Sequence, residues 1–320
     1  MKKIRMGILG CADIANRLVI PNMILSGNYD VVAFASRDYN KAILFKNKFG
    51  GIAVKDYQAL IERDDIDAVY IPLPPGLHYE WIIKALNAKK HVFSEKSITT
   101  NYNETKNIIS LARTEKLVVF ENFMFPFHSQ FEFVKEKIAN GAIGIIKLLR
   151  SSFGFPIFNA ETNIRYKKKL GGGALFDAGA YTLMAAQLFL GSEQKIIGAT
   201  LINNGKEVDF QGAVMLRNNA GIVSQLAFGF DNFYQNNIEL WGSTGKLTVM
   251  RAFTAGPGFM PEIIIEQQNK YEKFILNADN HSIKILNAFY NAICNNNYDI
   301  QYKQILNQSN LMTNIKEYAK

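Results

Sequence analysis

Short apolar runs alternate with helix-like stretches between residues 3 and 122, which is typical of a parallel sheet with crossover helices. The apolar runs that we predict to be strands lie at residues 4–9, 31–35, 68–71, 91–93 and 117–120. The helix-like stretches between them lie at residues 41–49, 57–62, 78–87 and 102–114. This pattern predicts an α/β domain of the Rossmann type over residues 1–122.

The pattern changes to strand-like alternation from residue 145 onward. The predicted strands lie at residues 145–153, 196–202, 211–217, 221–230, 236–241, 246–250 and 262–268. Such a run, with few helical interruptions, predicts an α+β domain on a large open, mostly antiparallel sheet. We assign residues 123–320 to this substrate-binding and oligomerisation domain. Residues 282–294 and 304–318 are predicted closing helices, and the last could pack back on the first domain.

Only one face of the predicted sheet has a helix to cover it, the stretch around residues 174–190. With no further helix expected for the other face, we expect that face to pair with a second subunit. A homo-oligomer, a dimer or a tetramer, is therefore predicted.

Composition narrows the class of protein. Hydrophobic residues make up 48% of the 320 residues, which suits two sizeable cores. No apolar run approaches the ~20 residues of a bilayer span, and the first one leads into a turn, unlike a signal peptide. Cys11 and Cys294 fit neither a disulfide framework nor a zinc site, and the four histidines form no ligand-spaced cluster. We expect a cytoplasmic protein without a membrane partner or a metal.

The formal net charge is +8, which by itself permits nucleic-acid binding. The lysines are scattered, however, and the densest cluster, Lys167-Lys168-Lys169, has no interleaved aromatic residues. A solvated basic surface therefore explains the charge better than a nucleic-acid partner. Attraction of an anionic dinucleotide or a nucleotide-linked substrate is the alternative.

The turn after the first predicted strand reads as a dinucleotide-binding fingerprint in which alanines replace two glycines: Gly10-Cys11-Ala12-Asp13-Ile14-Ala15. Gly10 permits the tight turn, and Ala15 is small enough for close packing of the helix on the strand. Ala12 crowds the pyrophosphate more than glycine would. Backbone N–H groups at the start of the following helix would hold the anion, unless the segment is a plain strand–turn–helix.

The end of the second predicted strand distinguishes the two nicotinamide cofactors. Enzymes that prefer NAD usually carry an acid there, which accepts a hydrogen bond from the ribose 2′-hydroxyl. Here the position is Ser36, followed by Arg37, and a hydroxyl and a guanidinium would bind a 2′-phosphate. We therefore predict NADP(H). Two alternatives stay open: Asp38 could play the acid in another register, and Arg37 could be an exposed loop arginine.

A lysine follows the carboxyl end of the fourth predicted strand, in the run Val92-Phe93-Ser94-Glu95-Lys96. Ligands of open α/β sheets bind at that edge. Here the chain resembles the Gfo/Idh/MocA oxidoreductase family, whose motif at this point ends in Glu-Lys-Pro. The resemblance implies that Lys96 contacts the nicotinamide side and the reacting oxygen. The sequence departs from the motif at Ser97, where the family has proline, and this puts the local backbone geometry in doubt.

The second domain adds a glycine-rich stretch that resembles the family's lead into Asp-x-Gly-x-His/Tyr: Gly171-Gly172-Gly173-Ala174-Leu175-Phe176-Asp177-Ala178-Gly179-Ala180-Tyr181. If a helix begins near Ala174, Asp177 and Tyr181 lie four apart on one face, so that an acid and a phenol reach one point. The plain alternative is a glycine-rich helix start with a structural cap.

Several short segments resemble one branch of the family, the nucleotide-sugar 3-ketoreductases of deoxysugar biosynthesis. They lie at residues 10–15, 35–38, 122–125, 128–130, 164–166, 239–243 and 251–254. The resemblance implies cofactor contacts from Leu73, His78, Glu95, Arg165 and Asp177. It also implies that Tyr234 and Thr254 line the nucleotide-sugar pocket. Helix-start packing for His78, cross-strand packing for Tyr234 and a turn role for Thr254 are alternatives.

The resemblance implies that NADPH reduces the C3 ketone of a nucleotide-linked keto-dideoxyhexose. Lys96 is the first choice of proton donor and electrostatic stabiliser, Tyr181 the second, and Asp177 orients one of them. Two other functions remain open. One is a dehydrogenase of free sugars, polyols or dihydrodiols, and the other is a regulator that binds a dinucleotide without catalysis.

Overall fold

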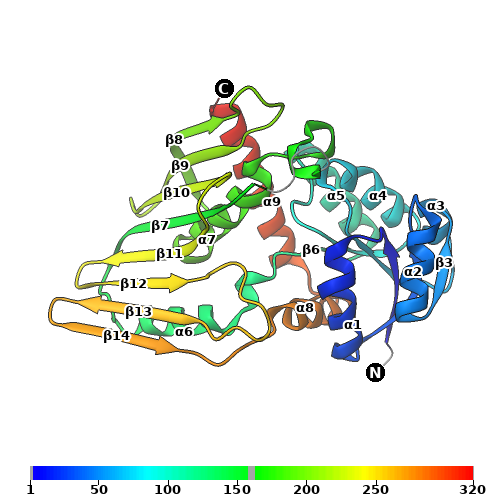
Figure 1. Cartoon of the computed structure of the whole chain (residues 1–320), viewed down its shortest axis with the longest axis horizontal. Helices are drawn as coiled ribbons and strands as arrows, with labels where there is room; N and C mark the ends of the chain where they lie inside the picture. Colours follow the sequence, from blue (N-terminus) through cyan, green and yellow to red (C-terminus); the bar gives the residue numbers. More distant parts are fainter. Residues whose placement is uncertain (1–2, 158–162, 320) are drawn as a thin grey trace. The chain divides into compact units, whose positions relative to one another are not determined.

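The computed structural model describes residues 3–157 and 163–319. The chain divides into two compact units, each of which gathers segments that are distant in sequence (Figure 1). The first unit comprises residues 1–124 and 282–309, and the second comprises residues 125–281 and 310–320.

The first unit is built on a six-stranded parallel sheet with the strand order β3-β2-β1-β4-β5-β6. Its strands are β1 (Ile4–Leu9), β2 (Tyr29–Ala35), β3 (Ile52–Val54), β4 (Ala68–Ile71), β5 (His91–Ser94) and β6 (Val119–Glu121). This order is that of a doubly wound dinucleotide-binding fold, which confirms the predicted Rossmann domain. The three-residue β3 was not predicted, because it is too short to show a periodicity.

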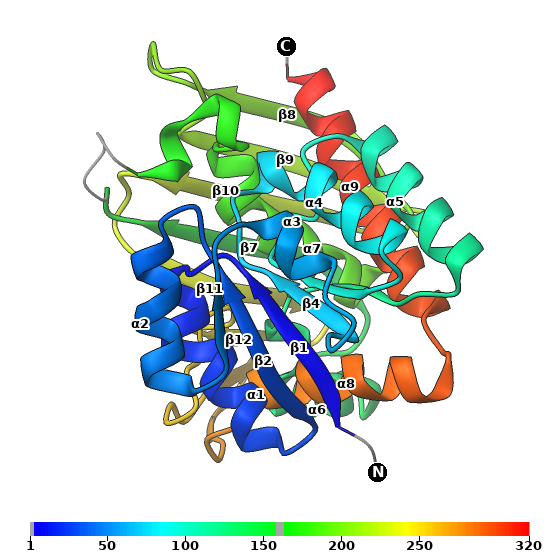
Figure 2. The same cartoon turned by 90° about the vertical axis from the view of Figure 1, so that its right-hand side faces the viewer.

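Helices connect these strands as a parallel sheet requires: α1 (Ile20–Ser26), α2 (Tyr39–Phe49), α3 (Tyr57–Ile61), α4 (Pro75–Asn87) and α5 (Tyr102–Glu115). Figure 2 shows the strands β1, β2 and β4 of this sheet together with the helices α2 and α4 of the same unit. Side chains from the strands and helices form one buried apolar cluster that includes Val69, Ile82 and Ile108. This rigid core fixes the carboxyl ends of the strands, where the candidate site begins.

Helix α8 (His281–Asn295) packs mostly with the first unit, although the sequence placed it in a second domain over residues 123–320. The ring of Phe289 lies 5.2 Å from that of Phe93 and 5.8 Å from that of Phe120. The Tyr29 hydroxyl donates a hydrogen bond to the Leu286 carbonyl at 2.5 Å. The first part of α9 (Asp299–Tyr318) belongs to the same unit, since Tyr302 joins its apolar cluster. Burial of aromatic side chains explains this assignment, and periodicity along the chain could not show it.

The second unit is built on an eight-stranded sheet with the order β14-β13-β12-β11-β7-β10-β9-β8. Its strands are β7 (Ile146–Phe155), β8 (Gln194–Ile202), β9 (Gln211–Asn218), β10 (Val223–Phe230), β11 (Gln235–Gly242), β12 (Gly245–Met250), β13 (Glu262–Gln267) and β14 (Lys270–Ile275). All neighbours are antiparallel except β7 and β10, which run parallel. The mostly antiparallel sheet is thus confirmed, and β14 is an addition to the predicted strands.

Two helices cover the inner face of this sheet, α6 (Ser129–Ala139) and α7 (Ala180–Leu190). Phe133 of α6 contacts Phe274 of β14 with ring centroids 5.2 Å apart, and Tyr181 of α7 lies 5.0 Å from Phe153 of β7. Helix α6 was not predicted from the sequence, but it lies on the same face of the sheet as α7, so the expectation for the other face is unchanged. The start of α6 is marked by a histidine cap, His128, whose Nδ1 accepts a hydrogen bond from the Gln130 N–H.

One helical stretch, residues 168–190, would be long and apolar enough to cross a membrane by length and composition alone. Within the structure 67% of that window is buried, and α7 packs on β7 and β10. The apolar composition of this stretch is therefore explained by its place in the core of the second unit.

Candidate active site

The turn after β1 has the shape that a dinucleotide requires. Gly10 has a φ of +129°, and a Cβ there would lie 2.8 Å from the Leu73 side chain, so only glycine fits. The helix begins directly afterwards, since the Asn16 N–H donates to the Ala12 carbonyl at 3.1 Å. Ala15 is fully buried, as expected for close packing of this helix on the sheet. Cys11, Asp13 and Ile14 lie in the same turn and first helical residues.

The end of β2 presents a hydroxyl and a guanidinium, and its acid is already engaged. The Asp38 carboxylate caps α2 by accepting the Asn40 N–H at 3.1 Å through Oδ1. Ser36 is buried and its oxygen accepts the Asp38 N–H. Arg37 is exposed, and Tyr57 lies near it: burial raises the pKa of the Tyr57 hydroxyl, and the charge of Arg37 opposes this shift. These groups fit a 2′-phosphate better than a 2′-hydroxyl.

Lys96 follows β5 in a segment that is tied to two neighbouring strands. The Glu95 carboxylate accepts the Tyr70 hydroxyl from β4 and the Asn122 amide from the end of β6, both at 2.7 Å. Enclosure of this carboxylate raises its pKa above the ordinary value, and its hydrogen bonds and Lys96 oppose the shift. The residue before Lys96 is therefore held by side chains on both sides of β5.

A second carboxyl group lies under the same segment. Glu121 at the end of β6 accepts the Ile98 N–H at 2.7 Å and is 7% exposed. Burial raises the pKa of Glu121 to about 8, with Lys96 lowering it and Glu95 raising it. The peptide bond between Lys96 and Ser97 is cis, so serine occupies the position of the family proline in this geometry.

The two ring nitrogens of His78 each lie next to a main-chain carbonyl. One ring nitrogen lies 2.7 Å from the Leu73 carbonyl and the other lies 2.9 Å from the Ser97 carbonyl. The side chain is fully buried, and this burial lowers its pKa. The structure therefore favours the helix-start packing role of His78, next to the Lys96 segment, over the direct cofactor contact that the resemblance implied.

In the second unit the glycine-rich stretch leads into a helix that begins at Ala174, as predicted. Asp209 fixes this start, because its carboxylate accepts the Leu175 N–H at 2.6 Å. Gly173 has a φ of +120°, and a Cβ there would collide with the Asp209 carboxylate. The glycine thus allows the cap to approach.

Asp177 and Tyr181 leave this helix one turn apart. The segment Leu175–Gly179, which includes Asp177, is π-helical. Such π-helical turns often occur at functional sites. Arg165 donates through Nε to the Asp177 carboxylate at 2.6 Å, so these two predicted residues are brought together. Lys96 and Tyr181 belong to different units, and their joint action stays a prediction.

The Tyr181 ring is surrounded by aromatic side chains of its own unit. Its centroid lies 5.0 Å from that of Phe153, 5.6 Å from Phe253 and 5.9 Å from Phe125. Rings at these distances are in packing contact, so the phenol ring is part of an aromatic cluster. The sequence did not point to these three phenylalanines as partners of Tyr181.

Tyr234 and Thr254, which are predicted to line the nucleotide-sugar pocket, come together at one end of β11 and β12. Their hydroxyl oxygens are 2.9 Å apart, and both side chains are exposed. Beneath them lies Asn236, which the sequence analysis missed. Its amide nitrogen donates to the Tyr234 oxygen at 2.8 Å and to the Thr254 oxygen at 2.7 Å. An amide at an inward position of a predicted strand was the available signal, since such groups are rarely buried without a role.

The first unit fits a phosphorylated dinucleotide on three local features: the Gly10 turn, the Ser36–Arg37 pair and the segment that carries Lys96. Within residues 3–157 and 163–319, no cluster of three or more His, Cys, Asp or Glu side chains could hold a metal ion. The reactive groups predicted from the sequence are a lysine, a phenol and a carboxylate, on Lys96, Tyr181 and Asp177.

Comparison with known families supports this assignment over most of the chain. A model described as an oxidoreductase family with an NAD-binding Rossmann fold matches residues 4–123. A model of the GFO/IDH/MocA C-terminal domain matches residues 131–248.

Individual relatives match over 80% or more of the chain. A dTDP-3,4-didehydro-2,6-dideoxy-alpha-D-glucose 3-reductase from Actinomadura kijaniata is 39% identical, covering 99% of this chain and 96% of that protein. A reductase of the same name from Saccharopolyspora spinosa is 42% identical, covering 90% of this chain and 87% of that protein. The crystal structure of KijD10, a 3-ketoreductase from A. kijaniata in complex with NADP and TDP-benzene, has a TM-score of 0.96 at 39% identity, covering 99% of this chain and 98% of that one. A D-xylose 1-dehydrogenase (NADP(+)) from Haloferax volcanii is 31% identical, covering 80% of this chain and 79% of that protein.

Proposed function

The chain belongs to the Gfo/Idh/MocA oxidoreductase family, and from this premise we propose that it is an NADPH-dependent 3-ketoreductase of deoxysugar biosynthesis. Its substrate is a dTDP-linked 3,4-diketo-2,6-dideoxyhexose, whose C3 ketone becomes an alcohol. The observation that carries the proposal is the similarity along 99% of the chain to a 3-reductase of that substrate class. The hydroxyl and guanidinium at the end of β2 support NADP(H) over NAD(H).

The reduction consumes one hydride and one proton for each ketone. NADPH supplies the hydride to C3 when it is bound, and the protein supplies the proton to the oxygen. Lys96, as an ammonium, donates this proton. Its positive charge stabilises the developing alkoxide, so the interaction is stronger in the transition state than in the ground state. The Glu95 and Glu121 carboxyl groups support this role, because they hold the Lys96 segment at the edge of the sheet.

Tyr181 is the second candidate proton donor. Its aromatic neighbours hold the phenol, and Asp177 one turn earlier carries the negative charge that is paired with Arg165. A comparison of Lys96→Ala with Tyr181→Phe separates the two roles. If Tyr181→Phe alone abolishes reduction while Lys96→Ala retains it, the phenol is the donor.

A coupled assay tests the proposed reaction. Free 3-keto sugars are labile, so an upstream 2,3-dehydratase generates the dTDP-linked ketone in the cuvette. We expect NADPH absorbance to fall with one equivalent of substrate and NMR to show a new C3 hydroxyl. Oxidation of free xylose with NADP⁺ and no reduction of the linked ketone would instead indicate a free-sugar dehydrogenase. NADPH binding without turnover of either would indicate a regulator.

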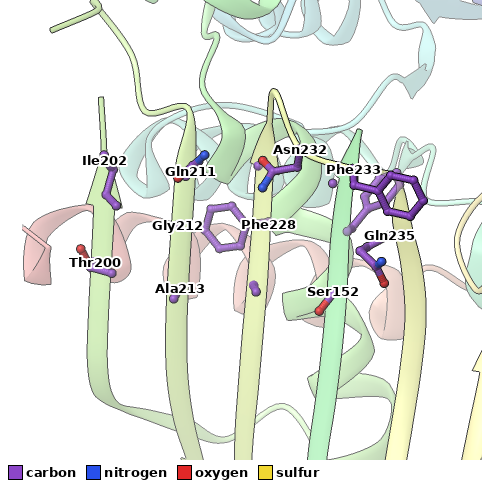
Figure 3. A pocket seen from close by; sticks show the side chains of 14 residues that line it. Ser152, Thr200, Ile202, Gln211, Gly212, Ala213, Phe228, Asn232, Phe233 and Gln235 are labelled. Atoms are coloured by element: carbon purple, nitrogen blue, oxygen red, sulfur yellow. The ribbon is translucent and has the colours of Figure 1, made fainter. Parts of the chain in front are cut away.

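The outer face of the second unit's sheet is proposed to bind a second copy of this chain. Figure 3 shows the side chains of this face, such as Thr200 and Gln235, on the side opposite the helices. They line a shallow hollow of about 300 Å³ whose rim includes Phe233, which is 85% exposed. Met215 of β9 and Trp241 of β11, in the same sheet, are also exposed, and exposed apolar patches can mark interfaces.

The charged side chains of that face favour a copy of the same chain over a charged partner. Arg150 pairs with Glu239 at 3.1 Å and Lys246 pairs with Glu266 at 2.6 Å, so the charges are neutralised within the sheet. A self-complementary surface needs this balance, because each patch meets itself in a twofold dimer. Light scattering of the double variant Met215→Glu, Trp241→Glu is expected to show half the mass of the wild type. Tyr318→Glu, at an exposed helical position, is the control, and a monomeric wild type would refute the interface.

We also propose that the protein is located in the cytoplasm. Cys11 and Cys294 are both free thiols, which suits the reducing cytoplasm.

A further inference from the structure

The two hydroxyl groups of Tyr234 and Thr254 rest on a buried amide whose orientation is determined. The Asn236 Oδ1 accepts the Phe253 N–H at 2.7 Å, and a backbone N–H can donate only to the oxygen end of the amide. The nitrogen end therefore faces the two hydroxyl groups, at 2.8 Å and 2.7 Å. Asn236 is 5% exposed, so water does not compete for these contacts.

Counting hydrogens shows what the cluster can offer to a ligand. Both amide hydrogens of Asn236 are used, one on each hydroxyl oxygen. Tyr234 and Thr254 carry one hydrogen each, and the 2.9 Å contact between their oxygens consumes one of the two. One hydroxyl hydrogen remains, and it cannot point inward, because the amide is already the donor there. The exposed side of the pair thus presents a single hydrogen-bond donor.

The cluster is also connected to the candidate proton donor of the same unit. Phe253, whose N–H is held by Asn236, packs its ring 5.6 Å from the ring of Tyr181. The Asn236 carbonyl accepts the Ala252 N–H at 3.0 Å, and the Ala252 carbonyl accepts the Gln130 amide at 3.2 Å. The segment that carries Phe253 and Thr254 is therefore fixed by polar contacts on both sides, although it has no regular secondary structure.

We propose that Asn236 is a positioning residue that makes the Tyr234–Thr254 pair a single-donor clamp for an acceptor oxygen of the nucleotide handle. This inference rests on the proposed function, which supplies the nucleotide-linked substrate. The acceptor is a phosphate oxygen or a pyrimidine carbonyl, which share the chemistry that the clamp recognises. A free sugar without the handle gains nothing from the clamp.

Thr254 provides the least disruptive test, because it is exposed. Thr254→Val keeps the shape of the side chain and removes the hydroxyl, whereas Thr254→Ser keeps the hydroxyl. Affinity for thymidine diphosphate, measured by calorimetry with NADPH present, is expected to fall about 10-fold in Thr254→Val and to stay within about 2-fold in Thr254→Ser. Thr244→Val, at the exposed turn between β11 and β12, is the matched control and should bind like the wild type.

Asn236→Asp tests the direction of the hydrogen bonds. A carboxylate still accepts the Phe253 N–H but cannot donate to the hydroxyls, so both hydroxyl hydrogens turn inward and the clamp presents only acceptors. Thymidine diphosphate affinity and KM for the linked ketone are expected to worsen by more than 10-fold, a larger effect than that of Thr254→Val. Thymidine as a second probe identifies the acceptor, since a loss confined to the diphosphate indicates a phosphate oxygen and an equal loss indicates the base.

Failure of the clamp and failure of the proposed function give different results. If the wild type neither binds thymidine diphosphate nor reduces the linked ketone, the proposed function fails and the clamp falls with it. If the wild type does both, but Thr254→Val binds like Thr244→Val and Asn236→Asp binds like the wild type, the clamp alone is refuted.

Discussion

Replacing Glu121 by glutamine should make the first unit more stable at alkaline pH. Glutamine keeps the size of the side chain and the oxygen that accepts the Ile98 N–H, but it has no proton to lose. In the wild type, burial is the main cause that raises the pKa of Glu121 from 4.5 to about 8. The folded state therefore holds this proton more tightly than the unfolded chain does.

The sign and size of the effect follow from this difference. The stabilisation by the bound proton is complete below pH 4.5 and is lost as the pH rises toward 8, at about 1.4 kcal/mol for each pH unit. The whole loss amounts to about 5 kcal/mol, a large part of the stability of an ordinary domain. Between pH 5.5 and 8 the wild type should lose about 3 kcal/mol relative to Glu121→Gln. Glu95 remains in both proteins, so the comparison reports on Glu121 together with its electrostatic coupling to Glu95.

Urea unfolding followed by tryptophan fluorescence measures the effect in the relevant unit. The chain has two tryptophans, and Trp81 lies in α4 of the first unit. In a Trp241→Phe background, the fluorescence of Trp81 reports on the first unit. Glu62→Gln, at an exposed position of the same unit, is the control for the change in net charge.

The result that would refute this reasoning is a free-energy difference between Glu121→Gln and its parent that does not change from pH 5.5 to 8. Glu121 would then lose its proton in the folded state as easily as in the unfolded chain. A greater loss of stability in Glu121→Gln than in its parent at pH 8 would mean that the ionised carboxylate stabilises the fold.

Three further predictions concern the active site. Lys96→Ala should lower kcat by about 10²- to 10⁴-fold with NADPH affinity little changed, as measured by stopped-flow absorbance, and an unchanged kcat would remove Lys96 from the chemistry. Arg37→Ala should raise KM for NADPH about 10-fold and leave KM for NADH unchanged, because only NADPH has a 2′-phosphate that the guanidinium can bind. Equal changes in KM for both cofactors would contradict this. Gly10→Ala should lower the thermal midpoint and weaken NADPH binding, because its Cβ meets Leu73 at 2.8 Å in a left-handed backbone, whereas Gly256→Ala, with open space around it, should change neither.

Local patterns along the chain were sufficient for the architecture of each unit. The alternation of apolar runs and helical stretches predicted the parallel sheet, since strand and helix periodicities are local properties. The motif around Lys96 and the glycine-rich stretch before Asp177 identified the family, and Ser36 and Arg37 at the end of the second strand indicated the cofactor. Elements without a clear periodicity were missed, among them the short β3 and the helix α6.

Tertiary structure alone decided which groups hold the functional side chains. Glu121 reaches Ile98 from another strand, and Asp209 caps a helix that begins 35 residues earlier in the chain. No periodicity encodes such contacts, because they depend on the register of strands and on the packing of distant segments. For the same reason α8 joined the first unit, although it follows the second in sequence.

The sequence by itself thus determined the fold of each unit and the candidates for the reactive groups, because motif spacing and hydrophobic pattern are written in consecutive residues. The burial that shifts the pKa of Glu121 and the amide that orients Tyr234 and Thr254 arose only on folding. Burial and hydrogen-bond direction depend on neighbours that are brought together in space, and a linear sequence does not specify these neighbours locally.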